Sequence, residues 1–174
     1  SAGTGEYQIC TKCILDSTVS EIRFDENGVC NYCHDYEDRI IKDLYYNEEG
    51  RIKLENLITS IKKNSSKRKY DCLIGLSGGV DSTFVAYLVK KKFGLRPLAI
   101  HLDNGWNSEL SVANIEQIVK RLDIDLITRV LDWNVFKDIQ ISFMKSLISN
   151  IEIPTDHAIW AVLIHTAKEM NIPY

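Results

Sequence analysis

The stretch Leu73–Leu88, LIGLSGGVDSTFVAYL, joins two apolar runs through the polar hexapeptide Ser77–Ser82. The first run has the length and the branched residues of a buried strand, and the second has the periodicity of a helix with a buried face. Gly78 and Gly79 permit positive φ and carry no Cβ, so backbone N–H groups can approach an oxyanion. The start of the helix adds unpaired N–H groups and the positive end of its dipole. The stretch therefore predicts a phosphate-binding turn between a strand and a helix.

An alternation of short apolar runs and amphipathic segments follows this turn. Strand-helix alternation implies parallel pairing with right-handed crossovers, so we expect an α/β fold, a Rossmann-like parallel sheet with helices on both faces. The expected strands are Cys72–Leu76, Leu98–Leu102 and Leu126–Leu131, and the expected helices are Ser82–Phe93, Glu109–Leu122, Val135–Leu147 and Asp156–Met170.

The hexapeptide also indicates which phosphate chemistry to expect. A carboxylate in a phosphate site requires a cation, so Asp81 predicts Mg²⁺ bridging protein and phosphate oxygens. Ser77 and Ser82 add hydroxyl donors. The GxxxxGK[ST] pattern of the Walker A loop is absent, and so is its phosphate-binding lysine. The alternative is an ordinary glycine-containing turn from strand to helix.

Four cysteines near the N-terminus form two CxxC pairs separated by sixteen residues, Cys10/Cys13 and Cys30/Cys33. Two such pairs complete the tetrahedron that structural Zn²⁺ prefers, and the hairpin-type turn Asp25–Gly28 between them fits a zinc ribbon. Four protein ligands leave no open position, so the metal would fold the module and would not catalyse. Disulfides, a redox CxxC pair and an iron–sulfur cluster are the alternatives.

Composition and organisation set further bounds. The chain has 174 residues, 45% hydrophobic and 26% charged, with a net charge of −3. These values are typical of a soluble globular protein and argue against a nucleic-acid partner. No apolar stretch is long enough for a bilayer and no signal-peptide pattern is present, so we expect a cytoplasmic protein with no membrane partner.

Four segments are predicted along the chain. Residues 1–9 comprise an expression remnant, Ser1–Gly5, and an N-terminal tail, and residues 10–34 form the zinc ribbon. Residues 35–69 form a helical connector and a basic linker, and residues 70–174 form the nucleotide-binding domain. The closing NIPY resembles the lead-in to a further parallel strand, so we expect a truncated fold whose C-terminal part is missing.

These motifs resemble a known superfamily. SGGVDS after a first strand resembles the PP-loop ATP pyrophosphatases, which adenylate a substrate oxygen and release pyrophosphate. Together with the paired CxxC motifs, the segments HLDNGWNS (His101–Ser108), DWNVFKDIQISFMK (Asp132–Lys145) and PTDHAIW (Pro154–Trp160) resemble the N-acetyl sugar amidotransferases of bacterial surface-polysaccharide and nonulosonic-acid pathways. The resemblance implies conversion of an acetamido group to acetamidino, using ATP, Mg²⁺ and ammonia from a separate glutaminase subunit. It also implies an acetamido sugar substrate, linked to a nucleotide.

The resemblance also implies roles for individual residues. Ser77 and Asp81 would be catalytic, and Leu102 and Asp103 would contact adenosine. The residues that would cradle the phosphates are Ser77, Gly78, Gly79, Val80, Asp81 and Ser82, and the substrate-side candidates are Asn104, Gly105, Trp106, Gln140, Lys145, Asp156 and His157. For Asp103–Gly105 a simple turn is the alternative, for Trp106 packing at the edge, and for the helical candidates a solvated face or a cap.

Two other functions remain open at this point. Some tRNA-thiolating enzymes also combine zinc knuckles with this loop, and they would require a basic face and a catalytic cysteine. Cys72 is the spare cysteine, and it begins a predicted core strand, where a small buried hydrophobe is expected. The basic candidates are Lys62, Lys63, Lys67, Arg68, Lys69, Lys90, Lys91 and Lys92. The third interpretation is a non-catalytic nucleotide-binding module that serves assembly with a partner.

Overall fold

The computed structural model describes residues 7–174, so the predicted expression remnant, Ser1–Gly5, lies outside the described residues. Contacts divide the chain into two compact units, one up to Glu55 and one from Asn56 to Tyr174. The helices and turns of the first unit are α1 (Asn31–Asp35), a π-helical turn η1 (Tyr36–Ile40) and a 3₁₀ turn η2 (Ile41–Asp43). Helix α2 (Glu48–Asn64) contains the division between the units. The boundary expected near residue 69 stays a prediction.

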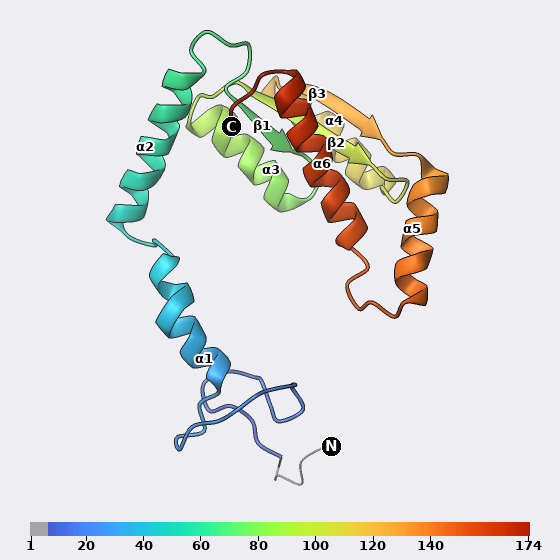
Figure 1. The fold of residues 1–174 in the computed structure, drawn as a ribbon. Coiled ribbons are helices and arrows are strands. Elements are labelled where there is room, and N and C mark those ends of the chain that lie inside the picture. Colours follow the sequence, from blue (N-terminus) through green and yellow to red (C-terminus); the bar gives the residue numbers. More distant parts are fainter. Residues whose placement is uncertain (1–6) are drawn as a thin grey trace. The chain divides into compact units, whose positions relative to one another are not determined.

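The second unit carries the sheet. Its strands are β1 (Cys72–Gly75), β2 (Pro97–Asp103) and β3 (Asp125–Val130). Its helices are α3 (Val80–Tyr87), continued by a π-helical turn η3 (Leu88–Lys92), then α4 (Glu109–Leu122), α5 (Trp133–Lys145) and α6 (Ile153–Glu169). Each predicted strand and helix of this unit is therefore present, α4 with its predicted bounds and the others with shifted ends (Figure 1).

The sheet is parallel and has the order β1-β2-β3. Leu73 pairs with Leu98, and Leu98 pairs in turn with Asp125. Because each strand returns through a helix, the carboxyl ends of all three strands lie at one edge of the sheet, which confirms the expected fold class. On the side of β1 away from β2, the Leu73 N–H donates a hydrogen bond to the Tyr174 carbonyl at 2.7 Å.

Alternate residues of the strands are buried on opposite faces of the sheet, as the period of two requires. On one face Ile74 and Ala99 pack with Ala86 of α3 and Ile115 of α4. On the other face Leu98 and Ile100 pack with Val162 and Leu163 of α6, and Ile172 joins this cluster. Helices therefore cover both faces, as the sequence predicts.

The starts of β1 and β2 are joined by a buried carboxylate. Asp71 is 4% exposed and accepts hydrogen bonds from the Ser65 hydroxyl at 2.7 Å and from the Arg96 backbone N–H at 2.7 Å. The Arg96 guanidinium adds bonds of 3.1 and 2.6 Å to the same carboxylate. Burial opposes ionisation of Asp71, but these donors outweigh it and hold the pKa of that carboxyl below its usual range.

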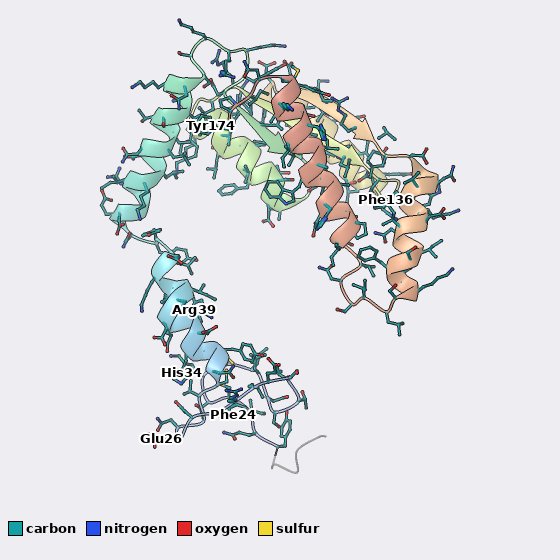
Figure 2. All side chains as sticks on the ribbon, viewed as in Figure 1. Phe24, Glu26, His34, Arg39, Phe136 and Tyr174 are labelled. Carbon is teal, nitrogen blue, oxygen red and sulfur yellow. The ribbon has the colours of Figure 1, made fainter. Side chains whose placement is uncertain are left out.

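The first unit has a different construction. Isolated antiparallel bridges pair Ile9 with Asp16 and Phe24 with Cys30. The expected turn is present inside the Phe24–Cys30 bridge, since Asp25 accepts from the N–H groups of Asn27 and Val29 at 2.9 and 2.8 Å. Phe24 precedes this turn and Glu26 lies in it, and both are labelled in Figure 2.

No helix within residues 7–174 is long and apolar enough to cross a membrane.

Candidate functional site

The predicted phosphate loop is a tight turn between β1 and α3. The Ser77 N–H donates to the Ser82 hydroxyl at 3.2 Å, and the two hydroxyl oxygens are 3.1 Å apart. Ser82 also donates to the Gly79 carbonyl at 3.2 Å, and Thr83 does so at 2.7 Å. The Gly79 carbonyl is thereby engaged, whereas the first N–H groups of α3 have no intrahelical acceptor and are available to an anion.

Gly78 is the position in this loop where glycine is required. Its φ is +78°, and a Cβ built there would lie 2.4 Å from the Ser111 carbonyl oxygen of α4. The Gly78 carbonyl accepts a hydrogen bond from the Asn114 amide at 3.2 Å. Helix α4 thus packs directly against the loop backbone at Gly78. Any side chain on residue 78 would increase the distance between the loop and α4.

A cavity of about 320 Å³ opens beside the loop at the carboxyl ends of β1 and β2. This is the edge at which open α/β sheets bind ligands. Gly75 lines this cavity without a side chain. A Cβ built on Gly75 would have one neighbour within 4 Å, Leu163 Cδ1 at 3.9 Å. The lining residues are Gly75, Leu76, Ser77, Ser82, Ile100, His101, Leu102, Asn104, Asn107, Thr155, Ile159, Val162 and Leu163.

The structure brings four of the sequence-predicted site residues together in this lining: Ser77, Ser82, Leu102 and Asn104. Asp81 is exposed in the first turn of α3 and is not part of the lining. Gly79 precedes α3 as its N-cap residue.

Two loop residues face another hollow. Gly78 and Val80 line a cavity of about 620 Å³ between α3 and α4, together with Arg121. Residues of the predicted phosphate loop therefore line two cavities, and of these two only the one at the strand ends has Ser77 and Ser82 in its lining.

The segment after β2 forms an ordered turn. The Asp103 carboxylate accepts from the Gly105 N–H and from the Asn107 amide, both at 2.9 Å. The Gly105 φ is +83°, and a Cβ there would meet the Trp133 ring at 2.7 Å. The Trp106 ring lies edge-to-face on Trp133, with centroids 5.5 Å apart. Asp103 and Gly105 thus shape the turn, and Trp106 stays 63% exposed.

The remaining substrate-side candidates lie on α5 and α6. Gln140 is buried, and its amide donates to the Ile151 carbonyl at 3.0 Å. His157 lines an apolar cavity of about 460 Å³ with Phe136, the α5 residue labelled in Figure 2. Lys145 and Asp156 are exposed, and neither belongs to the lining of a cavity described here for residues 7–174.

Sequence reasoning missed the α6 wall of the first cavity. Thr155, Ile159, Val162 and Leu163 have the spacing of one helix face, which is the signal that marks a buried stripe. That stripe does not reveal which strand end it covers. Asn107 was also missed, although it lies within the quoted motif after β2.

The four cysteine sulfurs lie within 4.8 Å of one another. The Cys10 and Cys33 sulfurs are 3.9 Å apart, and the Cys13 and Cys30 sulfurs are 3.7 Å apart. Tetrahedral Zn²⁺ with bonds of about 2.3 Å requires sulfurs about 3.8 Å apart, so the cluster fits one such ion. His34 bonds the Asp25 carboxylate at 3.0 Å and is not part of this group.

Backbone donors and crowding act on these thiols in opposite directions. Burial would raise the pKa of Cys10, but the N–H groups of Lys12 and Cys30 outweigh it and lower that pKa to about 6. Burial and then bonding to the other cysteine side chains raise the pKa of Cys33 to about 12. Four crowded thiols therefore cannot all ionise without a cation, which is the condition that a divalent metal relieves.

Cys72 has the properties of a core residue. It is 6% exposed and packs with Ile61 and Leu95. Burial, and then the charge of Asp71, raise the pKa of Cys72 to about 11. The thiolate form is therefore scarce at neutral pH, which is the opposite of what a cysteine nucleophile requires.

Comparison with known proteins gives several partial matches. An uncharacterized protein of Methanocaldococcus jannaschii is 27% identical over 131 residues, which cover 74% of this chain and 45% of the relative. A glutamine-hydrolyzing GMP synthase of Pyrobaculum aerophilum is 26% identical over 103 residues, covering 49% of this chain and 20% of the relative. One of Baumannia cicadellinicola is 38% identical over 74 residues, covering 42% and 14%. This chain thus spans less than half the length of each of these relatives.

Solved structures give a similar picture. An NH3-dependent NAD synthetase from Campylobacter jejuni has a TM-score of 0.47 and 17% identity, covering 68% of this chain and 52% of that one. An NMN synthetase from Francisella tularensis has a TM-score of 0.47 and 21% identity, covering 68% and 50%. Likeness at this level carries no argument about function.

The match that decides the family is to a protein-family model described as NAD synthase. It covers residues 53–146, which is more than half of the chain, and includes β1, the Ser77–Ser82 loop and β2. The expected PP-loop superfamily is confirmed by this match, while the narrower N-acetyl sugar amidotransferase family stays a prediction. The chain belongs to the NAD synthase family.

Proposed function

We propose that this protein is an ATP-dependent amidotransferase that adenylates the acetamido group of an N-acetyl sugar and replaces AMP with ammonia. The observation that carries the proposal is the cavity at the carboxyl ends of β1 and β2, which Ser77 and Ser82 both line. The start of α3 and the positive φ of Gly78 make that loop a phosphate cradle. The narrower resemblance of the motifs supplies the sugar.

The chemistry divides into two balanced steps. The acetamido oxygen attacks the α-phosphorus of ATP, the bond from that phosphorus to the bridging oxygen breaks, and pyrophosphate leaves. Ammonia then attacks the imidate carbon, AMP leaves with the oxygen, and the nitrogen loses protons to give the acetamidine. Adenylation is needed because an amide oxygen is a poor leaving group, whereas AMP is a good one. N–H groups and hydroxyls of the loop stabilise the charge that develops on the departing pyrophosphate.

Asp81 is the residue that would hold Mg²⁺. Its carboxylate is exposed in the first turn of α3, and no hydrogen bond or ion pair of its side chain is found within the described chain. A carboxylate oxygen is a ligand that Mg²⁺ accepts, alongside waters and substrate phosphates. The ion would neutralise charge on the leaving pyrophosphate. Asp81 itself keeps the ion next to the loop.

Ammonia would come from a separate glutaminase subunit. Two of the relatives described above are named as glutamine-hydrolyzing synthases, and this chain matches only a part of each. Cys72 is buried with a raised pKa and is unsuited to hydrolyse glutamine.

We further propose that the four-cysteine cluster binds structural Zn²⁺, because its sulfur distances match a single tetrahedral ion.

The burial of Cys72 also disfavours a tRNA-thiolating enzyme, which would use a reactive cysteine. Several of the basic residues that such an enzyme would offer to RNA are engaged within the chain. Lys69 pairs with the Asp125 carboxylate at 3.0 Å, and Lys90 lies 3.9 Å from the Asp123 carboxylate. A carboxylate next to each ammonium lowers the field available to phosphates.

The experiment is pyrophosphate and AMP formation from ATP and Mg²⁺, with ammonium and a panel of free and nucleotide-linked acetamido sugars. We expect release that requires both an acetamido sugar and ammonium, and its loss in Asp81→Ala. Asp138→Ala, on an exposed face of α5, is the matched control and should retain turnover. Pyrophosphate release with no sugar, or full activity of Asp81→Ala, would contradict the assignment.

A further inference from the structure

A second, smaller cavity lies next to the one that we assign to ATP. It has a volume of about 290 Å³ and is bounded by the turn after β2, by α5 and by the segment that leads into α6. Asn104 and Thr155 line both cavities, so these two side chains are the wall between them. The sequence does not reveal this adjacency, because the two residues are fifty-one positions apart.

The wall is closed by one hydrogen bond. The Asn104 amide nitrogen donates to the Thr155 hydroxyl at 3.3 Å, and the Asn104 carbonyl oxygen accepts from the Trp106 N–H at 3.1 Å. Both ends of the amide are therefore engaged, which fixes its orientation. A bond of 3.3 Å between two partly exposed side chains is long enough to open at small cost when a ligand offers a better partner.

The lining of the smaller cavity combines a flat aromatic surface with polar groups. Trp106 is 63% exposed and is held in place by Trp133, so its ring is available without reordering. Glu152 contributes a carboxylate, and Met144 and Ile151 contribute apolar surface. Gln140 is fixed by its bond to the Ile151 carbonyl. Aromatic rings cover the apolar face of a pyranose, a carboxylate accepts from its hydroxyls, and apolar side chains suit an acetamido methyl group.

We propose that this smaller cavity is the acceptor subsite. The ring of an acetamido sugar would stack on Trp106, and the acetamido oxygen of that sugar would reach the nucleotide across the Asn104–Thr155 wall. The proposal rests on the function proposed above and places the second substrate. The volume, near the lower end of about 300–1,000 Å³ for ligand sites, suits one sugar ring and excludes a second nucleotide. Asn104 would contact the substrate directly, since its amide would exchange the Thr155 hydroxyl for the acetamido oxygen.

The test measures two affinities separately on the same protein. N-acetylglucosamine is the sugar probe, glucose is its control without the acetamido group, and ATP with Mg²⁺ is the nucleotide probe. For Trp106→Ala we expect sugar affinity to fall about tenfold or more, which corresponds to about 1.4 kcal/mol, while ATP affinity changes less than about twofold. Trp106→Phe should restore most of the sugar affinity, because the ring is kept.

Trp160→Ala is the matched control. Trp160 is 65% exposed, close to the value for Trp106, and lies on α6 outside the lining of this cavity. Its removal should leave sugar binding unchanged. Equal losses in the two alanine variants, equal binding of glucose, or no sugar binding by a protein that still binds ATP would each overturn the subsite. Failure to bind ATP would instead overturn the function proposed above, so the two failures are distinguishable.

Discussion

The cysteine module and the α/β unit reach their folds in contrasting ways. Among the described residues up to Asp35, the buried side chains are those of Cys10 and Cys30, while Ile14 is 92% exposed. In the α/β unit, Leu98, Ala99 and Ile100 are each no more than 3% exposed and pack against helices on both faces of the sheet. The cysteine module therefore buries cysteine side chains, whereas the α/β unit buries aliphatic side chains.

This difference indicates that the two regions depend on different stabilising interactions. A segment of some twenty-five residues buries too little apolar surface to offset its conformational entropy, so such modules need a metal or a cross-link. The α/β unit buries apolar clusters on both faces of its sheet, so we expect it to fold without the metal of the cysteine module. Metal removal and core substitutions should therefore act on separate parts of the chain.

The largest expected effect is metal removal. Chelation, or Cys30→Ser, should abolish ordered structure in residues 10–34, because a structural zinc site supplies most of the folding free energy of so small a module. Amide hydrogen exchange resolved by residue would check this. Protection of β2 amides should persist in the same sample. Simultaneous loss of protection in β2, or no change in the module, would contradict the separation of the two regions.

The next effect concerns the loop within the α/β unit. Gly78→Ala should lower the free energy of unfolding by about 2–4 kcal/mol, since it adds a left-handed penalty of about 1–2 kcal/mol and a contact with the Ser111 carbonyl. Gly79→Ala is the matched control, because the Gly79 φ is −79° and a Cβ there meets only Ser77 Oγ at 3.4 Å. Urea titration of both variants measures the difference, and equal stability of the two would remove the requirement for glycine at 78.

A smaller effect is expected at the buried carboxylate. Asp71→Asn should cost about 1–3 kcal/mol at pH 7, because Arg96 and Ser65 lose a charged acceptor while Arg96 stays half-exposed to water. The folded pKa of Asp71 lies below its unfolded value, so its contribution is present above about pH 4 and is lost as pH falls through the folded pKa. The wild-type unit should therefore lose stability on acidification from pH 4 more steeply than Asp71→Asn. Parallel acid profiles would contradict the role of this carboxylate.

The smallest effect is expected for an exposed ion pair. Arg129 and Glu169 are 2.8 Å apart with side chains 44% and 60% exposed. Solvent screening and side-chain entropy cancel most of such an attraction, so Arg129→Gln should leave the midpoint of unfolding unchanged within error. A loss comparable to that of Asp71→Asn would show that surface charge, and not the core, stabilises this unit.

Much of the fold follows from local patterns in the sequence. The strands were predictable from branched apolar runs, and α4 has its predicted bounds, Glu109–Leu122, because Ser108 caps it and Asp123 ends it at φ +54°. The helix predicted over Ser82–Phe93 is present as α3 and the π-helical turn Leu88–Lys92, but no local pattern in the sequence marks the change of helix type at Leu88. Helix α6 begins earlier than expected, at Ile153, because proline is accepted in a first helical turn.

The candidate site was predictable only in part. The loop has a local signature, so Ser77 and Ser82 were identified from the sequence and lie in the cavity lining. The approach of Gly78 to Ser111 and the bond from Asn104 to Thr155 join distant segments. Such contacts depend on how helices pack on the sheet, and no local periodicity encodes them.

The most direct test of the central claim is residue-resolved mapping of ATP binding with Mg²⁺ by NMR. We expect shifted amides in the Ser77–Ser82 loop and at the end of β2, because Ser77, Ser82, Leu102 and Asn104 line the cavity beside the loop. We expect no shift around the four cysteines, for which we propose a structural role. Shifts confined to the cysteine module, or to the apolar cavity lined by Phe136 and His157, would contradict it.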